Sequence, residues 1–175
     1  MPVLSVEIPV IETERLVLRE PRMADLPAFA AFAASDRARF VGGANPAPYA
    51  AWDGLRGMLG HWLLRGFGWW TAEDRATGAT AGRLGIGHHI DWPEPELGWH
   101  LFDGFEGRGL AHEAALAVRR WWRGQGHPAP ISLIHPGNTR SIRLAERLGA
   151  VPEREITLRG APCTVWRHHR AEGAA

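Results

Sequence analysis

The chain has 175 residues, of which 45% are apolar and 22% charged, a balance that favours one globular domain and excludes a fibrous or low-complexity protein. Its 20 basic residues, all arginine, and its 19 acids leave a net charge of +1, which favours neither nucleic acid nor a membrane as a partner. The single cysteine, Cys163, excludes an intrachain disulfide and a zinc site of paired cysteines.

We expect a cytoplasmic protein that forms one domain over residues 1–175. A single cysteine suits a reducing compartment. The start of the chain lacks the basic leader and apolar run of a signal peptide, and no stretch approaches the ~20 consecutive apolar residues of a membrane span. Within this domain, residues 1–11 are expected to be an N-terminal extension and residues 169–175 a tail.

The first half of the chain predicts a strand, two helices and a three-strand meander. Residues 14–20 alternate charged and apolar side chains, which is typical of a half-buried strand. Apolar side chains then recur at helical spacing over 24–34 and 49–64. The meander is expected at residues 67–73, 80–87 and about 96–102, with Gly78 in its first hairpin turn.

The second half alternates helices and strands. A helix is expected from about residue 109 to 123, closed by glycines, and a short buried strand at 131–134. A last helix over 138–148 precedes two strands, at about 153–159 and 164–168. This order describes an α/β or α+β domain on a mixed sheet, in which the strands flanking the long helix should be parallel.

A glycine-bearing turn, Glu106-Gly107-Arg108-Gly109-Leu110-Ala111, precedes the long helix. Its small residues expose successive backbone N–H groups, and the helix N-terminus adds its positive end, so the turn suits an anion. Glycine at such a turn is more often ordinary loop chemistry. The turn also lacks the third glycine of a dinucleotide fingerprint and the lysine of a P-loop.

Other motifs give this turn its context. Glu96-Leu97-Gly98-Trp99-His100-Leu101 precedes it, and Asn138-Thr139-Arg140-Ser141-Ile142-Arg143-Leu144-Ala145-Glu146-Arg147-Leu148-Gly149 follows the long helix. The opening Thr13-Glu14-Arg15-Leu16-Val17-Leu18-Arg19 agrees with them. In this order the motifs closely resemble those of the Gcn5-related N-acetyltransferase (GNAT) superfamily, in its RimJ/RimL-like branch, from about Glu12 to the C-terminus.

The resemblance implies a GNAT-type fold: a mixed, mostly antiparallel sheet of six to seven strands with a parallel, splayed central pair and about four helices. It implies acetyl-CoA as cosubstrate and a primary amine as acceptor, either a protein N-terminus or a small molecule; homodimers are common in the family. The residues it assigns to acetyl-CoA are Trp99, Leu101, Gly107, Arg108, Gly109, Leu110, Ala111, Asn138 and Ser141.

Each of these residues has an implied role. The backbone N–H groups of Arg108 to Ala111 would cradle the pyrophosphate, with the Arg108 side chain as reinforcement, and the strand at Trp99 to Leu101 would bind the pantetheine arm. Asn138 would hold the pantetheine carbonyls, and it is independently expected as a helix N-cap. Ser141, one helical turn later, would reach the sulfur.

The implied reaction is direct attack of a neutral amine on the acetyl carbonyl, without an acetyl-enzyme. Glu96 is the best placed base, or else a solvated strand residue; His100 shares its face and would assist through a water, or else packs the sheet. Ala145 stands where many members carry a tyrosine acid, which leaves Ser141 or water to protonate the thiolate. That departure keeps a rival open, a non-catalytic acyl-CoA-binding sensor or partner module.

We expect the other residues with metal-binding or nucleophilic side chains to have structural roles. We expect no metal, because the neighbouring histidines His88-His89 and His168-His169 point to opposite faces of their strands. Cys163 is expected to be a small buried side chain and not a nucleophile. The acceptor pocket should be formed by residues about 40 to 70 and the closing strands, with these aromatic residues as either walls or core: Tyr49, Trp52, Trp62, Trp69 and Trp70.

Overall fold

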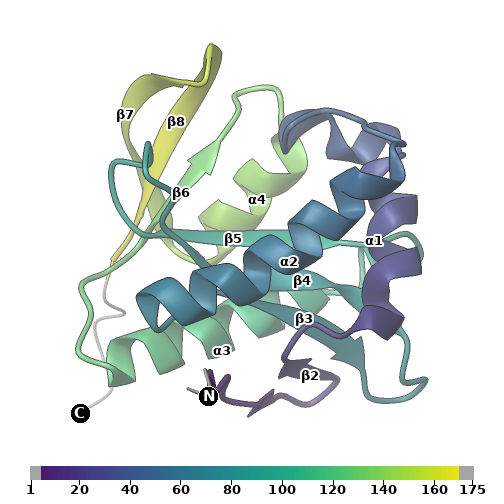
Figure 1. Ribbon diagram of the computed structural model, residues 1–175. Helices are drawn as coiled ribbons and strands as arrows, with labels where there is room; N and C mark the ends of the chain where they lie inside the picture. Colours follow the sequence, from purple (N-terminus) through teal and green to yellow (C-terminus); the bar gives the residue numbers. More distant parts are fainter. Residues whose placement is uncertain (1–4, 170–175) are drawn as a thin grey trace.

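The computed structural model describes residues 5–169, which form one eight-stranded sheet with helices on both faces (Figure 1). The spatial order is β1-β2-β3-β4-β5-β6-β8-β7, and only β5 and β6 are parallel neighbours. This mixed, mostly antiparallel sheet confirms the predicted fold class. The strands are β1 Ile11–Glu12, β2 Leu16–Arg19, β3 Trp69–Asp74, β4 Thr80–Gly87, β5 Glu96–Leu101, β6 Ile131–Ile134, β7 Ala150–Leu158 and β8 Ala161–His168.

In the described part of the chain, four α-helices cover the sheet: α1 Leu26–Ala33, α2 Pro48–Arg65, α3 Leu110–Gly124 and α4 Thr139–Arg147. Helix α2 begins at a proline, whose fixed φ suits the first helical position, and ends at Gly66, which has a left-handed φ of 74°. Two short 3-10 helices, Met23–Asp25 and Asp36–Phe40, flank α1. Among the helices of residues 5–169, none is long and apolar enough to cross a membrane.

Strand alternation gives each face of the sheet its own core. The core beneath α3 and α4 includes Leu84, Ile86, Leu97, Leu110, Ala114 and Leu144. The core beneath α1 and α2 includes Phe29, Leu55, Met58, Trp69 and Phe102. In β5, odd positions therefore face α3 and α4, whereas even positions face α1 and α2.

The sheet opens between its two parallel strands. Strand β5 pairs with β4 along all six of its residues, but it pairs with β6 only at Glu96 and Ile131. Beyond this pair, β5 and β6 are linked by hydrogen bonds between side chains and the backbone. The Ser132 hydroxyl donates to the Leu97 carbonyl at 2.6 Å, and the Leu133 N–H donates to the Glu96 carboxylate at 3.2 Å. This confirms the predicted splayed central pair.

Most predicted elements are present, and the differences have local causes. Strand β1, which pairs with β2, was missed because two residues are too short to show a period, so residue 11 belongs to the sheet. It raises the strand number to eight, above the expected six to seven. The loop between β7 and β8 is shorter than predicted, because Arg159 and Gly160 alone make a tight turn, with φ of 48° and 80°. Residues 170–175 of the expected tail lie outside the described residues.

Candidate active site

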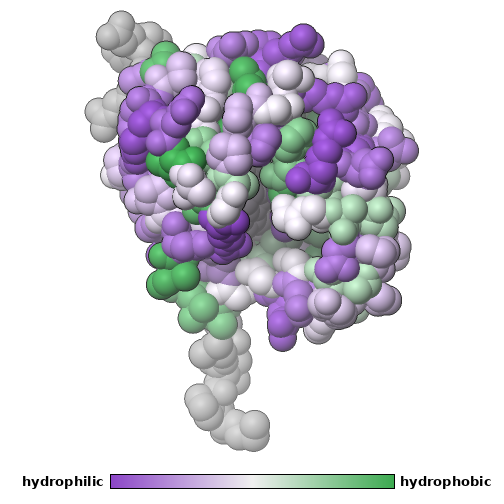
Figure 2. Space-filling view, turned by 90° about the horizontal axis from the view of Figure 1, so that it is seen from above, coloured by the Kyte–Doolittle hydropathy of each residue, from purple (hydrophilic) through white to green (hydrophobic). Residues whose placement is uncertain are grey.

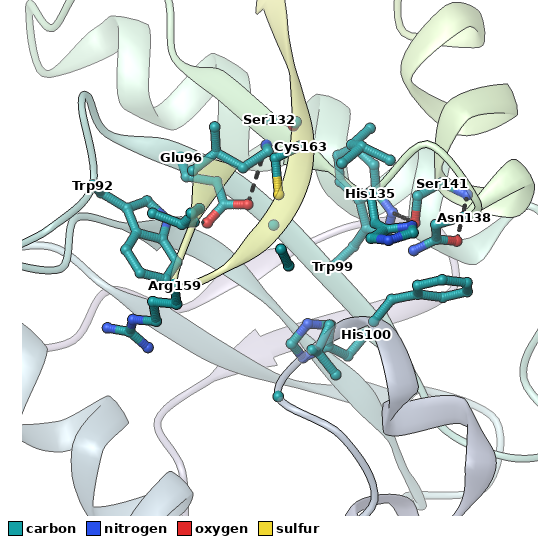
Figure 3. A pocket seen from close by; sticks show the side chains of 18 of the residues that line it. Trp92, Glu96, Trp99, His100, Ser132, His135, Asn138, Ser141, Arg159 and Cys163 are labelled. Atoms are coloured by element: carbon teal, nitrogen blue, oxygen red, sulfur yellow. Dashed lines mark hydrogen bonds between the residues drawn. The ribbon is translucent and has the colours of Figure 1, made fainter. Parts of the chain in front are cut away.

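A cavity of about 630 Å³ lies at the opening between β5 and β6. It is lined by β5, β6, the start of α4, the β7–β8 hairpin and residues 39–43, which include the end of the second 3-10 helix. The surface is visibly hollowed in the view of Figure 2, with hydrophilic residues along much of the rim. Inside, Glu96 and Cys163 lie on one side, and Asn138 and Ser141 on the other (Figure 3).

Glu96 stands at the point where the two strands separate. One carboxylate oxygen accepts a hydrogen bond from the Trp92 indole, and the other accepts from the Leu133 N–H at 3.2 Å. Burial raises the pKa of Glu96 to about 7, although these two hydrogen bonds and the positive charge of Arg83 act in the opposite direction. A carboxylate with this pKa is half ionised near neutral pH, which is the range in which a general base works best.

The edge of β5 that faces the opening is the proposed position of the pantetheine arm. Antiparallel strands alternate the direction of their backbone groups, and the hydrogen bond from the Phe102 N–H to the Ala81 carbonyl shows that even residues of β5 point towards β4. Trp99 and Leu101 therefore direct their backbone N–H groups towards the opening. Such an edge is ready to pair with an extended amide-bearing ligand.

Asn138 and Ser141 lie across the opening from this edge. The Asn138 side-chain oxygen accepts from the Ser141 N–H at 3.3 Å, which confirms the predicted N-cap of α4. The Ser141 hydroxyl accepts from the Trp99 indole N–H at 3.2 Å. Because that oxygen is used as an acceptor, its own proton remains available for a ligand in the cavity.

The glycine-bearing turn before α3 has the geometry of an anion cradle. Gly107 and Gly109 have left-handed φ values of 71° and 77°, and Gly109 is the N-cap of α3. A Cβ would meet no atom within 4 Å at Gly107, and at Gly109 only the end of Arg15 at 3.5 Å, so the turn is open. It lies outside the residues that line the cavity. Its open N–H groups at a helix N-terminus fit a pyrophosphate.

Side chains fix this turn from both sides. Arg15 donates to the Arg108 carbonyl at 2.7 Å and pairs with Glu113, in the first turn of α3, at 2.7 Å. The Arg108 side chain pairs with Asp74 at 3.3 Å. That contact occupies the guanidinium, so the backbone N–H of Arg108 is better placed than its side chain to hold a phosphate. Leu110 is fully buried and likewise offers only its backbone.

The structure gives His100 a partner other than Glu96. Its Nδ1 accepts from the Arg83 guanidinium at 2.6 Å, and its ring stacks between Phe32 and Trp69, each 5.6 Å away between ring centroids. Burial, together with the charge of Arg83, holds the pKa of His100 well below its usual value. His100 is therefore a neutral packing residue, and its hydrogen bond and ring contacts in the described part of the chain are with residues other than Glu96.

Cys163 is placed differently from our expectation. It is half-buried, lines the cavity and lies near Glu96, because β8 is the neighbour of β6. Burial and the negative charge of Glu96 raise the pKa of its thiol. The thiol is therefore mainly protonated at neutral pH, which agrees with the expectation that it is not a nucleophile.

The aromatic residues considered as pocket walls have separate positions. Trp69 lines the cavity, whereas Trp62 and Trp70 are almost fully buried in the core. Tyr49 and Trp52 are exposed on α2, with 63% and 43% of their surface accessible. In residues 5–169, no cluster of three or more histidine, cysteine, aspartate or glutamate side chains is arranged to hold a metal ion.

Sequence reasoning missed several cavity residues. Trp92 and Arg159 approach from loops, and Arg83 comes from the middle of β4. Ser132 is a single polar residue in an otherwise apolar strand, and its hydroxyl lies 2.8 Å from Nε2 of the buried His168. A lone charge in β4 and a lone hydroxyl in β6 are sequence signals that would have indicated both residues.

Comparison with known proteins agrees with the geometry. The family model described as the acetyltransferase (GNAT) domain matches residues 15–151. An acetyltransferase from Agrobacterium tumefaciens is 37% identical, with a TM-score of 0.83, over 97% of this chain and 99% of that one. A GNAT-family acetyltransferase from Bordetella pertussis is 27% identical, with a TM-score of 0.78, over 93% of this chain and 100% of that one.

A more distant structure shares the fold. RimL, a ribosomal L7/L12 alpha-N-protein acetyltransferase in complex with coenzyme A, is 17% identical, with a TM-score of 0.71, over 91% of this chain and 97% of that chain. At this identity the similarity concerns the fold alone. The match over residues 15–151 and the 37% identity are the stronger findings. The chain therefore belongs to the GNAT acetyltransferase family.

Proposed function

We propose that the protein is an N-acetyltransferase of the RimJ/RimL-like kind, which transfers the acetyl group of acetyl-CoA to a primary amine by direct attack. The observation that carries this proposal is Glu96, a half-buried carboxylate with a pKa of about 7 at the opening between the parallel strands. It lies across the cavity from Ser141, whose hydroxyl proton is available. The cavity thus offers a base and an acid on opposite sides.

The proposed binding residues belong to the turn before α3, to β5 and to the start of α4. The backbone N–H groups of residues 108–111 would hold the pyrophosphate, and Trp99, Leu101 and Asn138 would hold the pantetheine arm. When bound, acetyl-CoA supplies an activated acyl group with a thiolate leaving group. A backbone N–H on the open edge of β5 would donate to the oxygen on which negative charge develops.

Glu96 would take a proton from the acceptor amine, directly or through one water. Both of its oxygens already accept a hydrogen bond, but a carboxylate has about four lone-pair sites, so capacity remains. Because its pKa lies near 7, Glu96 is ionised above that pH and is protonated, and therefore inactive as a base, below it. As the amine nitrogen bonds to the acetyl carbon and the C–S bond breaks, Ser141 would donate its proton to the departing sulfur and regain one from solvent, while the proton taken by Glu96 returns to solvent.

The Ser141 role leads to a kinetic prediction. Ser141→Ala should lower kcat by about 10²-fold, which is the low end of the range for one proton donor, with little change in the KM for acetyl-CoA. Thr139→Ala is the matched control, because it removes an exposed hydroxyl from the same helix outside the cavity. Steady-state kinetics of both variants provide the measurement. Unaltered turnover in Ser141→Ala would show that water is the acid.

The acceptor amine should be weakly basic. An α-amine has a pKa of about 7.7–8.0 and a lysine side chain about 10.4, so at neutral pH the α-amine has several hundredfold more of its neutral form. A base with a pKa near 7 compensates poorly for that difference. We therefore expect a preference for peptide N-termini or weakly basic small amines. A peptide with a free N-terminus and no lysine should outcompete one with a blocked N-terminus and a lysine; the reverse preference would contradict this expectation.

The direct test of the proposed function is release of coenzyme A thiol from acetyl-CoA with a panel of amines. Amine-dependent release, with the acetylated amine identified by mass spectrometry, supports an enzyme. The rival is a non-catalytic acyl-CoA-binding module, which is favoured by the buried Ala145 at the position of the tyrosine acid. Tight acetyl-CoA binding without release for any amine would favour that rival.

A further inference from the structure

The acceptor side of the cavity contains a positive charge without a counter-ion. Arg83 lies in the middle of β4, where it pairs with His100 of β5. Its Nε donates to His100 Nδ1 at 2.6 Å, and within residues 5–169 the Arg83 side chain makes no other hydrogen bond. Among residues 5–169, no carboxylate lies within ion-pair distance of Arg83. Its two terminal amino groups therefore remain for a ligand in the cavity that it lines.

An aromatic platform fixes the position of this guanidinium. Its carbon lies 5.1 Å from the centre of the Trp69 ring, in cation–π geometry. The indole lies flat on glycine positions of the sheet: a Cβ at Gly98 would lie 2.2 Å from it, and one at Gly87 2.9 Å. His100 stacks on the same indole at 5.6 Å. Arg83 is thus held by a stack and by one hydrogen bond, and neither neutralises its charge.

Arg83 and Glu96 belong to the same face of the sheet. Arg83 lies directly opposite His100 in the pairing of β4 with β5. Glu96, Gly98 and His100 occupy every second position of β5 and therefore share one face of the sheet. Trp99, which contacts Ser141, belongs to the other face. The residues proposed for acetyl-CoA and those proposed for the acceptor therefore approach the opening from opposite sides. A group that binds Arg83 would belong to the acceptor.

The charge balance of the cavity agrees with an anionic ligand. Its lining residues include three arginines and one carboxylate, Glu96. Arg159 is neutralised by Asp91 through two hydrogen bonds of 2.6 and 2.9 Å. Burial lowers the pKa of Arg83 to about 10, while the charge of Glu96 raises it, so Arg83 is charged at neutral pH. A partly desolvated, unpaired guanidinium is stabilised by a planar oxyanion that accepts two parallel hydrogen bonds.

We propose that Arg83 selects acceptor amines that carry a carboxylate, which its two terminal amino groups bind while Glu96 receives the proton of the amine. This inference rests on the proposed function and narrows its substrate class to acidic acceptors, either amino acids or peptides with an acidic residue near the N-terminus. Carboxylate is the fitting anion because one guanidinium fork matches one planar carboxylate.

The experiment compares isosteric acceptors that differ only in charge. The pairs are glutamate with glutamine and aspartate with asparagine, as amino-acid α-amides and as the second residue of amidated glycyl dipeptides, so that the side chain provides the only carboxylate. In both dipeptides of a pair the reacting amine is the N-terminus of glycine, so its pKa hardly differs between them. The protein is expected to favour the carboxylate member by about 10- to 100-fold in kcat/KM, as for a hydrogen bond to a charged group.

Variants of Arg83 test the assignment. Arg83→Gln should bring the ratio close to one, because KM rises much more for the carboxylate member than for the carboxamide member, with unchanged coenzyme A affinity. Arg83→Lys, which keeps the charge and loses the fork, should give an intermediate ratio. Arg39→Gln is the matched control: it removes an exposed arginine from the same cavity and should keep the preference. Phosphoethanolamine in place of the carboxylates tests whether a phosphate is preferred.

A binding measurement separates this inference from the proposed function. Calorimetry would follow the binding of N-acetylglutamate and N-acetylglutamine, each as its α-amide, to the coenzyme A complex of the wild type and of Arg83→Gln. Tighter binding of N-acetylglutamate that is lost in the variant supports the carboxylate site even if no amine is acetylated, an outcome that would overturn the proposed function alone. Three outcomes would overturn the inference alone. They are turnover with equal kcat/KM for the two members of each pair, an equal loss of kcat/KM for both members in Arg83→Gln, and a preference for phosphoethanolamine. Neither turnover nor N-acetylglutamate binding would overturn both.

Discussion

Glu96→Gln is expected to lower kcat/KM for acetyl transfer by about 10²- to 10⁴-fold, the range attributed to one general base, while coenzyme A still binds. Glutamine preserves the shape of the side chain and the acceptor for the Leu133 N–H, but it cannot take a proton. Steady-state kinetics, with calorimetry of coenzyme A binding, provide the measurement. A variant with wild-type turnover would contradict the assignment of Glu96 as the base.

The pH dependence provides an independent check of the same residue. Glu96 must be ionised to act, so kcat/KM of the wild type should rise with pH and bend at about 7, and this bend should be absent in Glu96→Gln. Measuring the profile with two acceptors whose amines have different pKa values shows which group causes the bend. A bend caused by the amine shifts when the acceptor is changed, whereas one caused by Glu96 stays at about 7. Glu94→Gln is the matched control, since Glu94 pairs with Arg154 and Arg167 outside the cavity.

Gly109→Glu is expected to weaken coenzyme A binding by about 10²-fold or more, because it places a negative charge beside the proposed pyrophosphate site and forces a side chain into a left-handed conformation. Calorimetry measures the affinity, and circular dichroism shows whether the fold survives. Unchanged affinity in a folded variant would rule out the cradle.

Two control variants separate charge from backbone strain. Gly109→Asn introduces a side chain that tolerates the left-handed region and carries no charge, so its loss of affinity should be much smaller. Gly126→Glu places the same charge at a glycine with φ of 81°, just beyond the opposite end of α3. It should leave coenzyme A affinity unchanged. An equal loss in Gly126→Glu would attribute the effect to general destabilisation.

Elements with a strong period were predictable from the sequence. The amphipathic pattern of α3, the helical spacing of apolar residues in α2 and Gly78 in the β3–β4 turn predicted these segments to within a few residues. Asn138 was predictable as a cap because it precedes a helical pattern. The two-residue strand β1 and the 3-10 helix at Asp36–Phe40 were not, because neither is long enough to show a period.

The site was predictable where it is continuous in sequence and unpredictable where distant segments meet. Glu96, Trp99 and Ser141 belong to motifs, and they line one cavity as expected. The contacts of Arg15 with the turn before α3, and of Cys163 with the surroundings of Glu96, depend on strand order, which no single segment encodes. The roles assigned to the motif residues in binding and catalysis stay predictions.

The hydrogen bond between the Glu96 carboxylate and the Leu133 N–H has an evolutionary consequence. The same side chain that is proposed to take the proton also occupies the space in which β5 and β6 would otherwise pair. A lineage that replaced Glu96 with a small apolar residue would lose the proposed base and also a spacer that keeps the opening accessible. Replacement by glutamine would remove the proposed base and keep the spacer, so drift towards an inactive binding module would preserve the cavity only through a side chain of similar shape.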